Sequence, residues 1–187
     1  DGLNVISNPL LRPEHSTNFN AGSLYRKQRG LHGITLEGNY FYRDAENLIR
    51  LAATGAKSEY VNLSKATIQG LESEFTYQWD NRLWLSLNAT YQHMINKTKY
   101  DENGKLNHTF NDRLPNIPYL YGNFNRRYET NGQVIPLEGI SLSWHTRYVH
   151  EFYLQWPGHG AVKNTIPGQL VHHLELGYSH DEGTYNV

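Results

Sequence analysis

Apolar and polar residues alternate with a period of two along most of this chain, in segments about ten residues long. In the clearest segment, 71–79, apolar and aromatic side chains fill most odd positions and polar side chains fill the even ones. After a short polar turn at 80–82 the pattern continues through 83–91, with Trp84 as the exception. Successive side chains of a strand point to opposite faces, so the pattern predicts strands with one apolar and one polar face.

The same alternation recurs on both sides of this region. It is visible in 18–26, 34–42, 140–148 and 170–179, and 119–128 is the least regular segment. Helical periodicity is weak throughout. We therefore predict an all-β protein of about seven strands.

The predicted connections alternate between short and long. The short ones are 28–31, 80–82, 131–138 and 179–184. The long ones are 44–58, 96–114 and 154–167. Short turns at one end and long loops at the other are typical of transmembrane β-barrels. The predicted fold is thus an antiparallel up-and-down meander, a partial segment of a large transmembrane β-barrel.

Aromatic residues gather near the predicted strand ends. They include the run 40–42, Tyr119, Tyr121, Tyr148 and the pair 152–153. With 14 Tyr, 6 Phe and 4 Trp at a mean hydropathy of -0.68, the chain is both aromatic and polar. Such positions fit a girdle at a membrane interface. Cross-strand aromatic packing in a soluble sheet is the alternative.

Composition excludes several functions. The chain has no cysteine, so disulfides, thiolate metal sites and cysteine nucleophiles are excluded. A net charge of -1 gives no basic surface for nucleic acid. No apolar run is long enough for a transmembrane helix. The chain opens at Asp1 without Met, so we expect an excised segment, and the lack of a signal peptide carries no information about export.

No catalytic or metal-binding motif emerges from the 10 His and 18 acidic residues. His172 and His173 are adjacent, so on a strand they point to opposite faces and do not share a metal easily. Glu72 and Glu74 share one face, where a polar barrel wall is favoured over acid–base chemistry. We predict a protein that is not an enzyme and needs no cofactor.

Three stretches resemble a known family. Residues 8–16 (NPLLRPEHS) are similar to the NPxLxPExS stretch of TonB-dependent outer-membrane receptors, and 19–22 continue it. Residues 60–75 resemble the strand entry that carries a YVN and a GxExE element, and 113–119 resemble a later RxPxxP element. Their order and spacing extend the resemblance over almost the whole chain.

The resemblance implies a place in a larger protein. Barrels of this family have about 22 strands around a plugged lumen. Residues 1–187 are then expected to be a fragment of the C-terminal half of the barrel, with the start of another strand at 185–187. The plug domain and the last barrel strands are expected to be absent from this chain.

The resemblance also implies a function. Receptors of this kind are active importers in the outer membrane of Gram-negative bacteria, surrounded by lipid and lipopolysaccharide. They take up scarce, large nutrients, most often a ferric siderophore, with energy from TonB acting through the plug.

We predict that the loops contact the ligand, because their cations attract an anionic iron complex. The candidate residues are Arg50, Lys57, Lys97, Lys99, His108, Arg113, Trp156 and His159. The alternative for each charge is a solvated position facing the lumen or lipopolysaccharide.

Three other interpretations stay open at this point. Haem is an alternative ligand, with His15, His108 or His159 as the axial residue. A passive porin-type barrel shares the alternation. A soluble all-β carbohydrate-binding module would use Trp84, Trp144 or Trp156 as a sugar platform.

Overall fold

The protein is a strand-only structure in the parts that the computed structural model describes. These are residues 4–54, 57–100, 104–131, 138–154, 156, 164–180 and 183–186. The strands are β1 (Asn4–Ile6), β2 (His15–Arg29), β3 (His32–Thr54), β4 (Lys57–Trp79), β5 (Leu83–Asn96), β6 (Leu120–Asn131), β7 (Glu138–Val149), β8 (Phe152–Tyr153), β9 (Thr165–Ile166), β10 (Gln169–His180) and β11 (Gly183–Asn186). No helix among the described residues is long and apolar enough to span a membrane.

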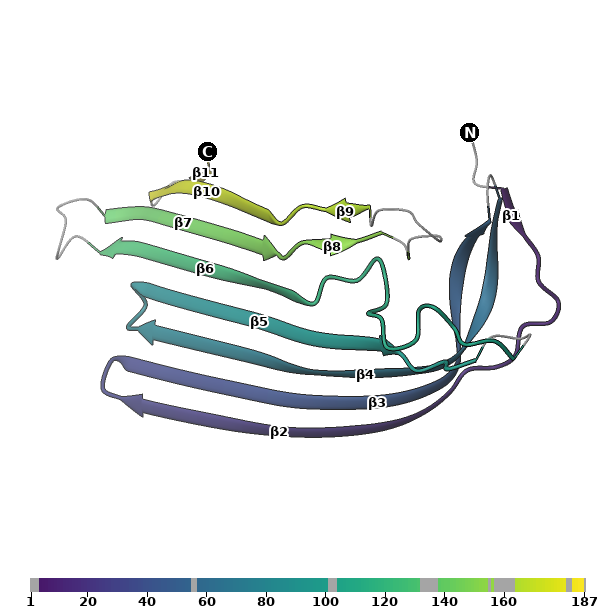
Figure 1. The fold of residues 1–187 in the computed structure, drawn as a ribbon. Coiled ribbons are helices and arrows are strands. Elements are labelled where there is room, and N and C mark those ends of the chain that lie inside the picture. Colours follow the sequence, from purple (N-terminus) through teal and green to yellow (C-terminus); the bar gives the residue numbers. More distant parts are fainter. Residues whose placement is uncertain are drawn as a thin grey trace.

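Nine strands form one curved sheet in the order β11-β10-β7-β6-β5-β4-β3-β2, with β1 on the edge of β4 (Figure 1). All pairs are antiparallel except β1 with β4, which is parallel. Strands β8 and β9 form a separate pair. In the described part of the chain β2 and β11 do not pair with each other, so the sheet is open. The predicted meander is confirmed, and so is a further strand near the C-terminal end, β11.

The register lines up apolar side chains in rows across the strands. Leu36 lies opposite Phe75, Phe75 opposite Leu87, and Leu87 opposite Phe124. Leu36 is 51% exposed and Leu87 is 49% exposed. We call this side the apolar face; it comprises these four residues, their partners in the register on β2, β7 and β10, and every second residue along each of these strands. So wide an exposed apolar surface fits contact with lipid better than contact with water.

The opposite side, the polar face, carries the intervening positions. Glu37 lies opposite Glu74, and Asn88 lies opposite Asn123. The amide of Asn123 donates to Asn88 Oδ1 at 3.0 Å. Trp84, which broke the predicted alternation, does lie on this face, between Gln78 and Arg127. Segment 119–128, the least regular in sequence, falls almost entirely in β6, whose register with β7 is even from Tyr121 to Glu129 and shifts between Glu129 and Asn131.

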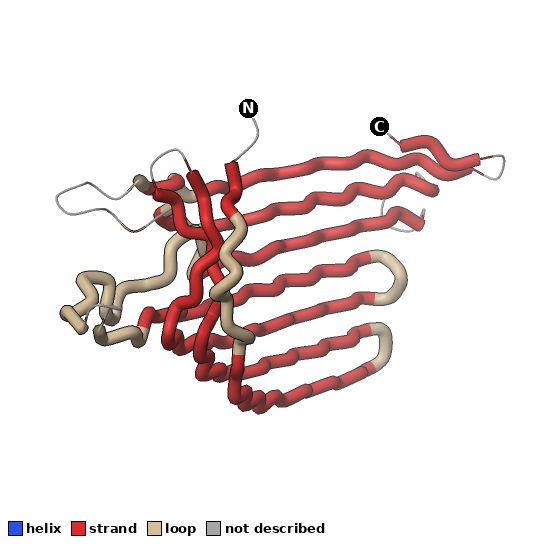
Figure 2. Tube along the Cα trace, turned by 90° about the vertical axis from the view of Figure 1, so that its right-hand side faces the viewer, coloured by secondary structure: helices blue, strands red, loops and turns tan. Residues whose placement is uncertain are grey.

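The two ends of the sheet differ. Tight turns join β2 to β3 and β4 to β5 at one end, and residues 97–119 and 150–168 connect strands at the other, the loop end (Figures 1 and 2). The short link predicted at 131–138 falls mainly outside the described residues. Short turns are therefore confirmed within 28–31 and 80–82, and a long connection is confirmed after β5.

The prediction of a long loop at 44–58 is wrong, because these residues continue two paired strands. Strand β3 continues to Thr54 and β4 begins at Lys57, so the two strands make a long hairpin. Backbone pairing persists to its tip, where Ala53 lies opposite Ser58. Such pairing satisfies backbone groups whatever the side-chain pattern, which is why the loss of alternation misled the prediction. Figure 2 shows the hairpin turning away from the main sheet at the loop end.

The best-buried side chains lie where this hairpin bends. Ala45 and Ala66 face each other and are both 0% exposed. Ala66 pairs on its other side with Asn96, and Leu114 packs against it. Leu48, Met94, Ile117 and Trp156 surround this cluster. Because Ala66 and Asn96 occupy polar-face positions, the loop that carries Leu114 folds over that face.

Candidate functional site: the loop end

The loop of residues 97–119 is anchored by one buried asparagine. Asn96 is 0% exposed, and its amide nitrogen donates to Thr109 O at 3.1 Å and Thr109 Oγ1 at 2.8 Å. Its amide oxygen accepts from Thr98 N at 2.9 Å. Asn107 Oδ1 accepts from Thr109 N at 3.1 Å. The polar atoms of Asn96 are therefore satisfied inside the protein, and they fix the loop to the end of β5.

The two long connections meet at the backbone carbonyl of Arg113. Trp156 Nε1 donates to this oxygen at 2.9 Å, and the Tyr153 hydroxyl donates to it as well. Asn116 N donates to Tyr153 O at 2.6 Å. Burial raises the pKa of the Tyr153 phenol, so the hydroxyl stays protonated as a donor. The loop end is thus a packed surface rather than two independent loops.

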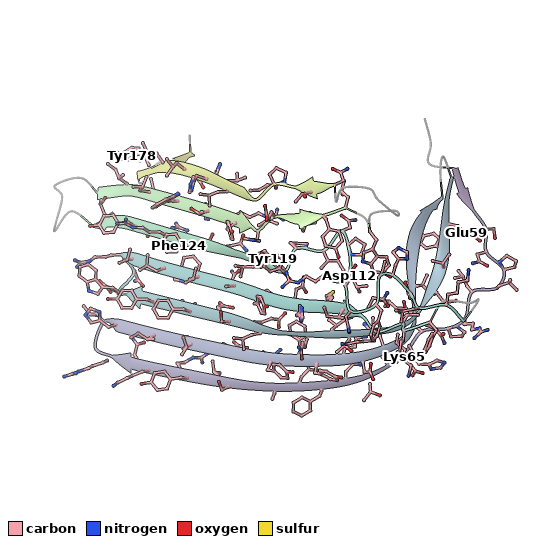
Figure 3. The ribbon with its side chains drawn as sticks, in the orientation of Figure 1. Glu59, Lys65, Asp112, Tyr119, Phe124 and Tyr178 are labelled. Carbon is pink, nitrogen blue, oxygen red and sulfur yellow. The ribbon has the colours of Figure 1, made fainter. Side chains whose placement is uncertain are left out.

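Aromatic rings surround the Arg113 side chain. Its guanidinium lies 4.2 Å from the ring centroid of Tyr119, a cation–π contact. Tyr119 in turn lies 4.6 Å from the ring of His150 and 6.4 Å from that of Tyr91. Figure 3 shows Tyr119 and Asp112 toward the loop end and Phe124 nearer the turns. The structure therefore brings two predicted candidates, Arg113 and Trp156, to one place.

The remaining candidates are spread over the loop end. Lys97 Nζ donates to Asn111 Oδ1 at 2.8 Å, and Lys99 lies 5.5 Å from the ring of Tyr100. His108 is exposed on the same loop. Arg50 and Lys57 lie in β3 and β4 near the hairpin tip, with side chains outside the described part, and His159 is outside the described residues altogether.

The N-terminal stretch makes contacts that sequence reasoning missed. Residues 7–14, the strap, cross the β3–β4 hairpin from β1 to β2. Asn8 Nδ2 donates to Tyr60 O at 2.9 Å, and the Glu14 carboxylate accepts from Ile49 N at 2.6 Å. Glu14 also lies 3.8 Å from the Arg43 guanidinium. The strap residues belong to the first resemblance motif and Tyr60 opens the second, so the two motifs contact each other.

The polar face also holds the predicted carboxylates. Glu72 and Glu74 share this face as predicted, and the Glu72 carboxylate accepts from Asn39 Nδ2 at 3.2 Å. His172 and His173 lie on opposite faces, as predicted. His173 of β10 faces His145 of β7, a pairing for which no sequence motif is visible. Only the register between β7 and β10 shows this pair.

Comparison with known proteins places this architecture. A family model described as "TonB dependent receptor-like, beta-barrel" matches residues 1–187. The chain is similar to the copper transporter OprC, with TM-score 0.66 and 18% identity, over 91% of this chain and 24% of that one. It is also similar to the FrpB iron transporter of Neisseria meningitidis (F3-3 variant), with TM-score 0.60 and 16% identity, over 99% and 26%.

The siderophore receptor PirA of Acinetobacter baumannii gives TM-score 0.57 and 17% identity, over 92% of this chain and 26% of that one. No curated protein sequence matches the chain. The chain spans about a quarter of the length of the three solved structures named above. At such identities the likeness shows the fold alone.

An antiparallel sheet with one apolar and one polar face and with packed loops at one end defines a wall segment of a large β-barrel. With the family match over its full length, the chain belongs to the TonB-dependent receptor-like β-barrel family. This family and the structural neighbours are receptors and transporters rather than enzymes. The family assignment replaces the porin-type barrel and the soluble carbohydrate-binding module.

Proposed function

We propose that this chain is part of an outer-membrane importer for a scarce nutrient too large for porins, with ferric siderophores as the favoured class. The observation that carries the proposal is the joining of the two long connections at the Arg113 carbonyl. That junction makes a shaped surface at the end of the sheet where a barrel of this family opens to the outside. Lys97, Lys99 and Arg113 give it positive charge toward an anionic iron complex.

The names of similar proteins support the substrate class without fixing it. The neighbours are described as a copper transporter, an iron transporter and a siderophore receptor. Haem is the alternative ligand from the sequence, through His15, His108 or His159. An uptake assay with both haemin and ferric siderophores distinguishes the two.

The chain is proposed to sit in the outer membrane of a Gram-negative bacterium. Its apolar face would contact lipid and, toward the loop end, lipopolysaccharide. Exposed Tyr40 and Tyr148 near that end fit an interfacial position, since a tyrosine ring tolerates one apolar and one wet side. Energy would come from TonB through a plug outside this chain, because these residues are proposed to be a fragment of the C-terminal half of the barrel.

Iron uptake in cells tests this function. The complete gene is expressed in a host that lacks its own siderophore receptors, with and without TonB, and uptake of radioactive ferric siderophores and of haemin is measured. We expect siderophore uptake only with TonB. Uptake that is equal without TonB, or no uptake of any iron complex by folded receptor, would contradict the proposal.

Two test variants, each with a matched control, show whether the ligand binds at the loop end. Trp156→Phe removes the indole donor to Arg113 O, whereas Trp144→Phe changes a tryptophan on the apolar face. We expect a severalfold weaker siderophore affinity for Trp156→Phe alone. Similarly, Lys97→Ala with Lys99→Ala should slow association and reduce its salt dependence, whereas Lys27→Ala at the turn end should not.

A further inference from the structure

Two histidines face each other on the polar face, away from the loop end. His145 of β7 and His173 of β10 are directly opposite in the register. Their ring centroids are 6.1 Å apart and their planes meet at 30°. A metal–nitrogen bond of about 2.1 Å places two imidazole centroids about 5 to 6 Å apart when both rings bind one ion. The observed spacing is close to that range, and neither side chain is covered by other parts of this chain that the structure describes.

A third residue orients one ring. His145 Nδ1 lies 2.9 Å from Asn125 Oδ1, and these residues are opposite each other in β7 and β6. An amide oxygen only accepts hydrogen bonds, so Nδ1 carries the proton and Nε2 keeps its lone pair. Metal-binding histidines commonly donate their second ring nitrogen in this way, which fixes both tautomer and orientation.

The surroundings suit a hydrated cation. His145 lines a hollow of about 660 Å³ together with Trp84, Ser143 and Glu175. The two arginines of this hollow are ion-paired, Arg127 with Glu129 and Arg82 with Asp80. Among the described residues the Glu175 carboxylate has no ion-pair partner. The hollow is therefore large enough for water and has a negative charge available beside the histidine.

We propose that His145 and His173 bind one divalent transition-metal ion of the kind that imidazole prefers, Cu²⁺ or Zn²⁺. Among the described residues no group of three or more His, Cys, Asp or Glu side chains is placed so that it could hold a metal ion. The two imidazoles are thus the protein ligands from this chain, and water completes the coordination. Such a site binds more weakly than a closed site with four protein ligands.

Metal titration of the complete receptor tests the site. Purified receptor in detergent is stripped with chelator and titrated with Cu²⁺ or Zn²⁺ by calorimetry. His145→Gln and His173→Gln should each lose one equivalent of bound ion. The matched control is His172→Gln, the neighbour of His173 on the apolar face, whose Nδ1 lies 2.9 Å from Thr146 Oγ1. This control should bind as the unmodified receptor does.

A second measurement does not depend on the variants. The electron paramagnetic resonance spectrum of the Cu²⁺-loaded receptor should show coupling to two imidazole nitrogens. Asn125→Ala should weaken Cu²⁺ binding about tenfold or more, since it removes the hydrogen bond that orients His145. Coupling to one nitrogen or none, or equal ion binding by the His145 and His173 variants and the unmodified receptor, would overturn the proposal.

Discussion

The side-chain amide of Asn62 binds both backbone groups of Arg12. Asn62 Oδ1 accepts from Arg12 N at 2.8 Å, and Asn62 Nδ2 donates to Arg12 O at 3.0 Å. The same amide nitrogen donates to Asn47 O at 2.7 Å. The Asn62 side chain therefore makes the pair of backbone hydrogen bonds that a neighbouring strand would make, and it holds the strap against the hairpin. This gives a physical reason for an asparagine within the YVN element beside a proline-rich stretch.

Removing the Asn62 amide should loosen the strap. Asn62→Ala leaves two Arg12 backbone groups without their partner, at a cost of about 1 kcal/mol each at this partly exposed site. We expect faster hydrogen exchange at residues 8–14 of the receptor, with Asn62→Asp intermediate because it keeps the acceptor. Asn18→Ala in β2, whose amide nitrogen donates to the nearby Ser16 Oγ at 3.4 Å, is the control. Unchanged exchange in Asn62→Ala would show that the strap is held by other contacts.

The anchor of the long loop should also be costly to remove. Asn96→Ala leaves Thr98 N without its hydrogen-bond acceptor in a buried place, whereas Thr109 O still accepts from Asp112 N and Thr109 Oγ1 still donates to Asn107 Oδ1. We therefore expect a loss of stability of about 1 to 3 kcal/mol. Limited proteolysis should cut the variant within residues 97–119 faster. Asn20→Ala, at an exposed position of β2, should leave the cleavage pattern unchanged. Equal cleavage of the two variants would contradict the anchoring role.

Gly70 is required by close packing. A Cβ at this position would clash with the Tyr91 carbonyl and with the ring of Phe41, which covers the glycine from β3. Gly70→Ala should therefore reduce the yield of folded barrel, measured as the heat-modifiable band of outer-membrane receptor in a gel. Gly38→Ala is the matched control in β3, because its Cβ would meet only Ser23 Oγ at 3.9 Å. Similar yields for the two variants would contradict the packing argument.

The ion pair between Glu46 and Lys65, past the aromatic run 40–42 toward the loop end, makes a contribution to stability that depends on pH. Lys65 Nζ lies 2.9 Å from Glu46 Oε1, four residues past Tyr42 along β3. The hydrogen bond and the charge of Lys65 lower the pKa of Glu46 from its ordinary value of 4.5, and Glu46 raises the pKa of Lys65 from 10.5. The stabilisation from Glu46 is thus complete above pH 4.5 and disappears as the pH falls through the lowered pKa.

Both partners are solvent-exposed, so the effect is expected to be small. Thermal unfolding of the receptor should show a slightly larger decrease between pH 5 and pH 3 than unfolding of Glu46→Gln, because the variant has no carboxylate to protonate there. The raised pKa of Lys65 predicts that the stabilisation from its charge is lost only above pH 10.5. Identical pH profiles for the two proteins would mean that the pair contributes nothing measurable.

The sequence predicted the sheet well because each strand must alternate to have one apolar and one polar face. Segment 71–79 shows this most clearly, and its pairing with β3 and β5 follows the predicted register of faces. The hairpin tip was missed because backbone pairing past the apolar face does not require apolar and polar side chains to alternate. Strand β1 was missed because its pairing with β4 joins residues far apart in sequence, at the edge that β5 leaves free.

The sequence predicted that the candidate site lies in the long loops, but not which contacts form it. Loop charges such as Lys97 and Lys99 are visible in the sequence, but the Arg113 carbonyl as meeting point is not, because a backbone acceptor has no sequence signature. The His145–His173 pair was hidden for a related reason: adjacency of His172 and His173 is local, whereas their partners depend on how β7 and β10 align. Side-chain periodicity defines faces, and register defines neighbours.

Cysteine labelling on intact cells tests the central claim, that the loop end is the outer surface of a membrane-spanning receptor. Residues 1–187 contain no cysteine, and any cysteine elsewhere in the receptor is first replaced by serine. Single cysteines are then introduced at Leu106, which is 67% exposed in the long loop, and at Asn81 in a tight turn. With a membrane-impermeant maleimide, we expect Leu106→Cys to react on intact cells and Asn81→Cys to react only after the outer membrane is opened. Labelling of Asn81→Cys on intact cells with Leu106→Cys protected would contradict the account.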